Sequence, residues 1–316
     1  MLHHFTRSIA HIALPDKFTY PFHYTPHPLC VMAADEVQVY LQHQAQWQDE
    51  LQQGKMFGVL IVQTTEGEIG YLAAFSGILA GKNIHPYFVP PIYDLLQPDG
   101  FFKKEEEHIS AINHRIRELE EDTSYQKCRQ ALEEETARCS RLLSQAKAKL
   151  KAAKELRDCR RQTEQLSESE QAAMIRESQF QKAELKRLER SLKEHLSSLQ
   201  KETDTYVSQI EALKNERKSR SATLQQQLFE QFRLLNARGE VKDLCSIFAH
   251  TVHKIPPAGA GECAAPKLLQ YAYFHHYRPV AMAEFWWGDS PKAEIRHHGH
   301  YYPACKGKCE PILGHM

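Results

Sequence analysis

Apolar residues recur at coiled-coil spacing through the middle of the chain. Between residues 185 and 213 they step by three or four positions, which is a heptad pattern with one four-residue stutter at 192–196. The earlier half has the same spacing more weakly. The positions are Ile109, Ile112, Ile116, Leu119, Leu132, Cys139, Leu142, Ala146, Leu150, Ala153, Leu185, Leu188, Leu192, Leu196, Leu199, Thr203, Tyr206, Ile210 and Leu213. The pattern predicts long helices that bury one narrow stripe.

The poorest helical stretch lies near the midpoint, at residues 166–171 (Leu-Ser-Glu-Ser-Glu-Gln). A reversal there predicts an antiparallel hairpin whose arms are each about 100 Å long, at 1.5 Å per residue. An unbroken helix that pairs with a second copy is the alternative, because intramolecular and homodimeric heptads look alike. Arg157 and the neighbouring charged residues are expected on a solvated face.

Outside this segment the apolar pattern predicts a mixed α/β domain. Short apolar runs bounded by turn residues indicate strands, and longer runs of helix formers indicate helices. The expected elements are helix 34–53, strands 56–63 and 68–75 with a turn at 64–67, helix 264–276, strand 280–287, and a further helix after the loop 302–309.

Glycine and proline mark the same division. All 14 glycines and all 15 prolines lie within 1–100 or 239–316. We therefore expect a first part of an α/β domain at 1–100, a coiled-coil hairpin at 101–238 and a second part of the α/β domain at 239–316. The fold class is α+β, an α/β domain interrupted by a long antiparallel coiled coil.

Composition excludes several classes. Forty basic residues balance forty acidic ones, so no overall field draws the chain to nucleic acid or an anionic membrane. No apolar run reaches the roughly 18 residues of a transmembrane helix, and the first residues do not resemble a secretory signal. Of eight cysteines, three stand singly in the helical segment, which favours a reducing cytoplasm over a disulfide scaffold.

The order helix, strand, strand, helix, strand, helix resembles the cytidine-deaminase fold. That resemblance implies a zinc ligand in a His/Cys-x-Glu motif and two more in Pro-Cys-x-x-Cys. Here the matching segments are Cys263-Ala-Ala265 and Pro303-Ala-Cys305-Lys-Gly-Lys-Cys309. Alanine stands at 265, where the family has its acid/base glutamate, so deaminase chemistry needs a displaced acid/base.

Cysteine and histidine residues gather near the end of the chain. Cys263, Cys305 and Cys309, with His297 from the run between them, supply the ligand types of a tetrahedral Cys3His zinc site. The alternative is that Cys263 packs in a core while the other two cysteines flank an exposed glycine turn. No cofactor is required by this reading, and Zn²⁺ is the candidate.

An aromatic and basic run precedes and overlaps this cluster. Aromatic rings stack on unpaired bases, and basic side chains contact phosphates. Strand packing is the alternative for the two tryptophans, because aromatic residues alternate there as in a two-sided buried strand. The candidate RNA-binding residues are Trp286, Trp287, Arg296, His298, Lys306 and Lys308.

Several longer strings carry a second resemblance: GEIGYLAAFS (67–76), FVPPIYDLL (88–96), PPAGAGECAAPKLLQYAY (256–273), AMAEFWWG (281–288), and YPAC (302–305) with CEPIL (309–313). They are similar to the amino-terminal extension of long RluA-type RNA pseudouridine synthases. The resemblance implies an isomerase that uses an aspartate in His-Arg-Leu-Asp. No such tetrapeptide occurs here; the nearest string is Arg187-Leu-Glu-Arg190.

The resulting hypothesis is an accessory region that positions rRNA or tRNA for a pseudouridine synthase domain expected beyond residue 316. The chain alone is expected to be inactive, without a membrane partner. Two alternatives stay open: a zinc-dependent deaminase-like protein, and an interaction protein whose coiled coil pairs with a partner.

Overall fold

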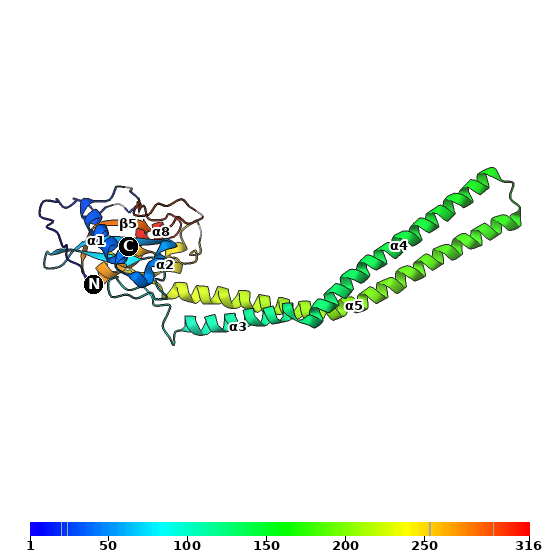
Figure 1. The fold of residues 1–316 in the computed structure, drawn as a ribbon, viewed down its shortest axis with the longest axis horizontal. Coiled ribbons are helices and arrows are strands. Elements are labelled where there is room, and N and C mark those ends of the chain that lie inside the picture. Colours follow the sequence, from blue (N-terminus) through cyan, green and yellow to red (C-terminus); the bar gives the residue numbers. More distant parts are fainter. Residues whose placement is uncertain (20, 24, 253, 293) are drawn as a thin grey trace. The chain divides into compact units, whose positions relative to one another are not determined.

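The computed structural model describes residues 1–19, 21–23, 25–252, 254–292 and 294–316 (Figure 1). The chain divides into two units, one of Met1–Glu106 with Ser221–Met316 and one of Glu107–Arg220. The helices are α1 (Pro28–Gln42), the 3-10 turn η1 (Ala45–Trp47), α2 (Gln48–Gln52), α3 (Phe101–Glu121), α4 (Thr123–Thr163), α5 (Glu168–Gln231), α6 (Leu244–Phe248), α7 (Ala264–Phe274) and α8 (Cys309–His315). The strands are β1 (Lys55–Gln63), β2 (Ile69–Phe75), β3 (Arg233–Leu235), β4 (Val241–Asp243), β5 (Arg278–Trp287) and β6 (Tyr301–Tyr302).

A four-stranded antiparallel sheet organises the first unit. Its strand order is β2-β1-β5-β6, so the long strand from after the helices pairs with the strand from before them. Phe57 lies opposite Phe75 on one side and Phe285 on the other. Strands from both flanking parts thus share one sheet and one unit.

Helices cover the two faces of the sheet. Side chains alternate along β1, so Phe57, Val59 and Ile61 pack with α1 while Leu60 and Val62 pack with α7. Both clusters are built from apolar side chains, because each helix presents one buried and mainly apolar stripe to the sheet. The domain is therefore a helix–sheet–helix sandwich, which explains why β1 and β5 read as nearly continuous apolar runs.

A smaller cluster forms beside this sandwich. The β3–β4 hairpin, α6 and α8 bury Leu234, Phe248 and Ile312 against one another. Phe229 and Phe232, at and just after the end of α5, belong to the same cluster. This packing fixes α8 in the domain, and α8 carries one of the candidate ligands at its first residue.

The second unit is an antiparallel helical hairpin in which α4 runs beside the returning α5 (Figure 1). Lys214 pairs with Glu120 at 2.7 Å, and Lys147 pairs with Glu189 at 3.3 Å, so paired residues come closer in sequence toward the turn, as they must in an antiparallel hairpin. Ile210 is buried against the stripe of α3. Every expected seam position from 185 to 213 is buried or half-buried. The intramolecular hairpin, expected from sequence, is thus present.

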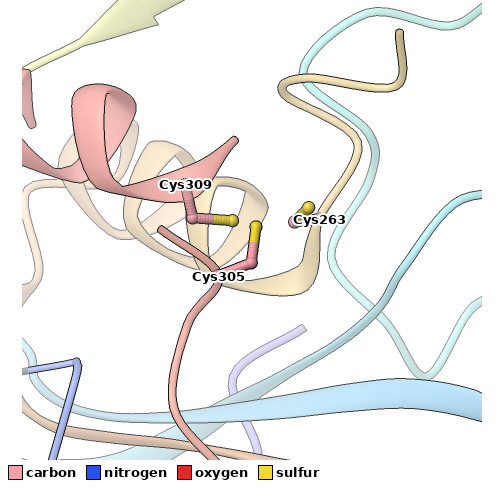
Figure 2. Close-up of side chains that lie close together, drawn as sticks. All are labelled: Cys263, Cys305 and Cys309. Carbon is pink, nitrogen blue, oxygen red and sulfur yellow. The ribbon is translucent and has the colours of Figure 1, made fainter. Parts of the chain in front are cut away.

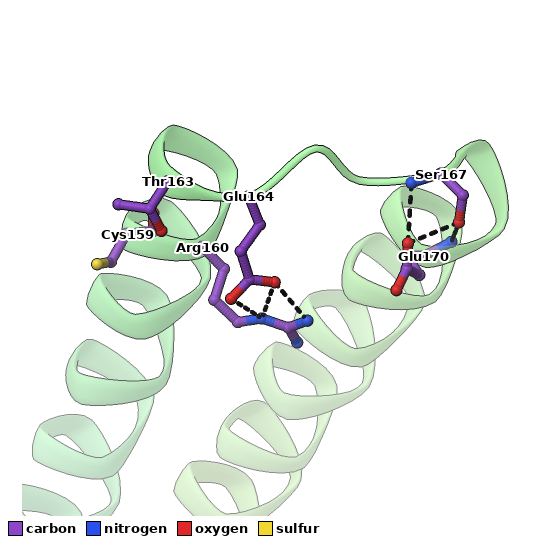
Figure 3. A network of polar contacts seen from close by, with 6 residues as sticks. All are labelled: Cys159, Arg160, Thr163, Glu164, Ser167 and Glu170. Carbon is purple, nitrogen blue, oxygen red and sulfur yellow. Dashed lines mark hydrogen bonds and ion pairs between the residues drawn. The ribbon is translucent and has the colours of Figure 1, made fainter.

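A capping box starts the returning helix. The Ser167 hydroxyl accepts from the Glu170 N–H at 3.4 Å, and the Glu170 carboxylate accepts from the Ser167 N–H at 2.8 Å (Figure 3). On the other side of the turn, Arg160 and Glu164 form an ion pair at 2.9 Å. Polar side chains therefore satisfy the helix ends where the sequence predicts the reversal.

Some boundaries differ from the expectation. The first arm of the hairpin is interrupted between α3 and α4 at Asp122, whose side chain caps α4 by accepting from the N–H groups of Ser124 and Tyr125. The helical segment ends at Gln231 rather than at 238, because the residues that follow pair as the β3–β4 hairpin. The expected helix 34–53 begins earlier, at Pro28, and is interrupted after Gln42.

Arg157 corrects the expectation of a solvated face. Its side chain is buried between the helices, where the guanidinium donates to the Gln181 side-chain oxygen at 2.8 Å. The seam near the tip holds small residues, which leaves room for a long side chain to lie along it. Within the described residues, no helix is both long and apolar enough to cross a membrane.

Candidate metal centre

The start of α7 positions Cys263. This residue is the N-cap of the helix, with extended backbone angles (φ −68°, ψ 160°), and Pro266 follows within the first turn, where proline is tolerated. Ala264 packs directly over Gly58 of β1, where an added Cβ would lie 3.0 Å from the Ala264 Cβ. Small residues on both elements therefore hold the first turn of α7 close to the sheet.

The start of α8 positions the other two cysteines. Cys309 is its first residue, and its N–H donates to the Cys305 carbonyl at 3.1 Å. This closes a single turn from Cys305 to Cys309, so the i, i+4 spacing places both sulfurs on the same side. Because α7 and α8 contact each other, the turn meets the start of α7.

The three sulfurs converge in one place (Figure 2). The Sγ atoms of Cys263, Cys305 and Cys309 all lie within 4.8 Å of one another. In a tetrahedral zinc site with Zn–S bonds of about 2.3 Å, sulfurs are separated by about 3.8 Å. A small inward movement of side chains therefore suits the cluster to a metal ion, and three thiolates are the donors that Zn²⁺ prefers. The arrangement could hold a metal.

Hydrogen bonds distribute the protons of this cluster unequally. Bonds from the Cys263 and Cys309 thiols, helped by the backbone N–H groups of Cys309 and Lys308, lower the pKa of Cys305. The hydrogen bond with Cys305 and burial raise the pKa of Cys263, and hydrogen bonds with Cys263 and Cys305, together with burial, raise the pKa of Cys309. The metal-free cluster therefore favours one thiolate at Cys305, the cysteine accessible to solvent, with two protonated neighbours.

His297 does not join the three cysteines. It lies in the loop between β5 and β6, where its N–H donates to the Tyr302 hydroxyl at 2.6 Å and its ring lies 5.3 Å from that of His300. It is not among the ligand atoms that lie within 4.8 Å of one another. The expected Cys3His set is thus corrected to three cysteines, with the fourth position not supplied by His297.

The two tryptophans are core residues. Trp286 is 9% exposed and Trp287 is 6% exposed. The Trp286 indole N–H donates to the Asp289 carbonyl at 2.9 Å, while Trp287 belongs to the α1-side cluster. Their rings are not available to stack on bases, which corrects the RNA-contact expectation in favour of strand packing.

Of the basic candidates for RNA contact, Arg296 and His298 lie between β5 and β6, and the two lysines lie between Cys305 and Cys309. The Arg296 guanidinium lies over the rings of Trp286 and Tyr302, 5.2 and 5.1 Å from their centroids, and forms an ion pair with Glu294 at 2.8 Å. Its positive charge therefore already has partners within the domain. The exposed His298 accepts from the Gly288 N–H at 3.0 Å.

Lys306 and Lys308 stand in the turn between the two cysteines. Lys306 is exposed and Lys308 is half-buried as the N-cap of α8. Of the candidates for RNA contact, these two lysines are placed directly beside the cysteine cluster.

Two buried charged residues near the cysteines were not expected from the sequence. Lys267 of α7 donates to the carbonyls of Phe75 and Gly77 at 2.9 and 3.3 Å, and burial lowers its pKa to about 8. Glu284 of β5 accepts from the Ala265 N–H at 3.3 Å. The sequence feature that could have identified both is an ionisable residue inside an otherwise apolar helix or strand.

No family model, no curated protein and no solved structure matches the chain.

Proposed function

We propose that this chain is an accessory region of an RluA-type RNA pseudouridine synthase, which positions structured RNA for a catalytic domain. One observation carries the proposal. The strings that resemble the family are far apart in sequence, yet they lie in the same unit, where α7 contacts β2, β5 and α8 and the cysteines of α7 and α8 meet. Residues that share a resemblance and also share a site are expected to serve one function.

The RNA contact is proposed to be electrostatic. Lys306 and Lys308 lie in the same turn, whereas Trp286 and Trp287 are buried and therefore cannot stack on bases. Contacts from lysines to phosphates position an RNA without reading its sequence. A positioning role suits a chain in which His-Arg-Leu-Asp is absent and no residue carries over as catalytic for uridine isomerisation.

Zn²⁺ is proposed as the ion at Cys263, Cys305 and Cys309. Bound there, it would tie the N-terminal ends of α7 and α8 together and fix the turn that carries the two lysines. A metal that orders a basic turn links the cysteine cluster to the RNA role, because lysines on a fixed turn lose less conformational entropy on binding.

Binding of a structured rRNA fragment and of a tRNA, measured by fluorescence anisotropy at several salt concentrations, tests the proposal. Changing both Lys306 and Lys308 to Gln is expected to weaken binding and to lower the salt slope by about one per contacting lysine. Lys292→Gln, in the loop after β5, is the matched control. A salt slope unchanged in the double variant contradicts the lysine contacts, and an absence of binding at low salt contradicts the RNA role.

A second candidate is a zinc-dependent deaminase-like activity. The observation in its favour is that Cys263 stands at the start of α7 while Cys305 and Cys309 stand at the start of α8, in the element order of that fold. Assays of ammonia release from cytidine and adenosine, free and in RNA, separate the two candidates. Release that is lost in Cys263→Ala favours the second; no release from any of them eliminates it.

A further inference from the structure

Glu284 is a carboxyl group placed in the interior of the sheet. It lies on β5 opposite Gly58 of β1 and Tyr302 of β6, and it is 7% exposed. The absence of a side chain at Gly58 leaves space for it on the α7 side, where it accepts the hydrogen bond from the Ala265 N–H. Glu284 therefore reaches the first turn of α7, two residues after Cys263.

The carboxyl is electrically coupled to all three sulfurs. Its negative charge raises the pKa of Cys263 and of Cys309, and the Cys305 thiolate in turn raises the pKa of Glu284. Charges influence one another in this way over short distances in a buried site. Glu284 is nevertheless outside the group of ligand atoms that lie within 4.8 Å of one another. It is placed as a neighbour of the three-sulfur site and not as a fourth direct ligand.

Burying the charged form of the Glu284 carboxyl without an ion-pair partner costs free energy. Burial raises the pKa of Glu284 to about 7, and the hydrogen bond from the Ala265 N–H and the positive charge of Arg296 offset this only in part. Within the described part of the chain, Glu284 has no ion pair, and the one hydrogen bond to its side chain comes from a backbone N–H. Buried carboxyl groups are normally paired or bound to a metal site. A water bound to a divalent ion at the three sulfurs would add a further hydrogen bond to this carboxyl.

A small cavity lies beside the segment of β5 that carries Glu284. Glu284, Tyr301, Tyr302 and Pro21 line a cavity of about 20 Å³. A cavity of about this size holds one water molecule when polar groups surround it.

We infer that Glu284 is the positioning residue of the metal centre, and that it holds by hydrogen bond the water molecule that fills the fourth coordination position of an ion bound to Cys263, Cys305 and Cys309. The inference rests on the metal binding proposed above. Three protein ligands and one water are the composition of an open zinc site, whereas a structural site is closed by a fourth protein ligand. An outer-shell carboxyl that orients a ligand is a usual part of such sites.

An open position has a consequence for ligands. A small neutral donor such as imidazole can replace the water and bind the metal. Since Glu284 stabilises the bound water, loss of this side chain is expected to make the replacement easier. A centre closed by a protein ligand takes up no imidazole.

The test uses the full chain loaded with Co²⁺, whose visible absorption reports the ligands. Metal content and affinity are measured first by competition with a chromophoric chelator, and imidazole is then titrated while the spectrum is followed. We expect wild type to bind one Co²⁺ and to take up imidazole, and Glu284→Gln to bind one Co²⁺ and take up imidazole about tenfold more tightly, within the range of outer-shell effects. Glu262→Gln, which removes a different carboxyl, adjacent to Cys263 in sequence, is the control expected to match wild type.

Each outcome separates the two proposals. A wild type that binds no Co²⁺ overturns the metal site itself. If wild type binds Co²⁺ but takes up no imidazole, the proposed metal site stands and the proposed open coordination position is wrong. This result needs no variant. Equal imidazole affinities in wild type and Glu284→Gln, both carrying one Co²⁺, overturn the role of Glu284. Should the Gln variant not fold, Glu284→Ala with Co²⁺ added during refolding gives the same comparison.

Discussion

Ala264 of α7 rests on Gly58 of β1 so closely that a Cβ at position 58 would lie 3.0 Å from the Ala264 Cβ. The contact sets the distance between the first turn of α7 and the sheet. Cys263 precedes this turn and Glu284 lies opposite Gly58, so a single small residue governs both the cysteine cluster and the carboxyl beside it.

Enlarging Gly58 should therefore affect both stability and metal binding. Gly58→Val is expected to destabilise the domain by about 1–3 kcal/mol, as overpacking of a core does, and to weaken metal binding because α7 is pushed from the sheet. Denaturant unfolding and chelator competition measure the two effects. Gly314→Ala, where an added Cβ meets nothing within 4 Å, is the control. Unchanged stability in Gly58→Val contradicts the close packing.

The metal-free protein should lose stability as the pH rises past the ordinary range of a carboxyl. The pKa of Glu284 is raised by burial from 4.5 to about 7, so between these values the folded state holds a proton that the unfolded state has released. Stability is then fully present below pH 4.5 and falls as the pH rises to about 7, by up to about 3 kcal/mol.

Urea unfolding of the metal-free protein across this pH window measures the effect. Glu284→Gln has no proton to lose there, so the difference in stability between wild type and variant should change with pH while other groups cancel. Parallel curves for the two proteins contradict the raised pKa.

Metal binding should release protons. Two of the three sulfurs have raised pKa values and are protonated in the metal-free cluster, and a metal ion binds thiolates. Zinc uptake is therefore expected to release about two protons and to tighten as the pH rises. Calorimetry in buffers of different ionisation enthalpy counts the protons, and chelation should lower the melting temperature.

Cys305→Ser provides the comparison for that experiment, since it removes the thiolate while keeping the shape of the turn. It is expected to lose zinc binding, and with it any effect of chelator on melting. A wild type that stays free of zinc and melts at the same temperature with and without added zinc contradicts the metal site.

The helical hairpin should depend on its turn. Ser167→Ala removes the hydroxyl half of the capping box, and the loss of such a cap costs about 1 kcal/mol. Because the turn lies at the end of the hairpin, faster amide hydrogen exchange is expected there first. Ser144→Ala, at an exposed position inside α4, is the control and should leave exchange unchanged. Equal exchange at the tip in both variants contradicts the capping role.

Much of the architecture could be predicted from local patterns. The heptad spacing from Leu185 to Leu213 identified the buried stripe of α5, because a helix that buries one side must repeat apolar residues every three or four positions. The apolar runs around Val59 and Phe285 likewise predicted strands. The separate break at Asp122 was missed, since a single capping residue interrupts the helix without changing its composition.

The candidate site was predictable only in part. Cys263, Cys305 and Cys309 stood out as metal-ligand types and do converge, but His297 has the same ligand chemistry and lies elsewhere. Closeness in sequence does not show where a side chain in a loop points, so it could not separate His297 from the ligands. Trp286 and Trp287 fitted both strand packing and base stacking, and their burial in the sheet decided between them.

By itself, the sequence determined the helices, the strands, the reversal near Ser167 and the division of the chain at the helical segment. These properties depend on neighbours within a few residues, so they are written in the local order of apolar, polar and turn-forming side chains. Only the tertiary structure decided which cysteines meet, which histidine does not, and that Glu284 comes to lie beside the start of α7. Those contacts join β5 and α8 to α7 across the sheet, and they depend on strand register and on the close approach allowed at Gly58, which no local pattern encodes.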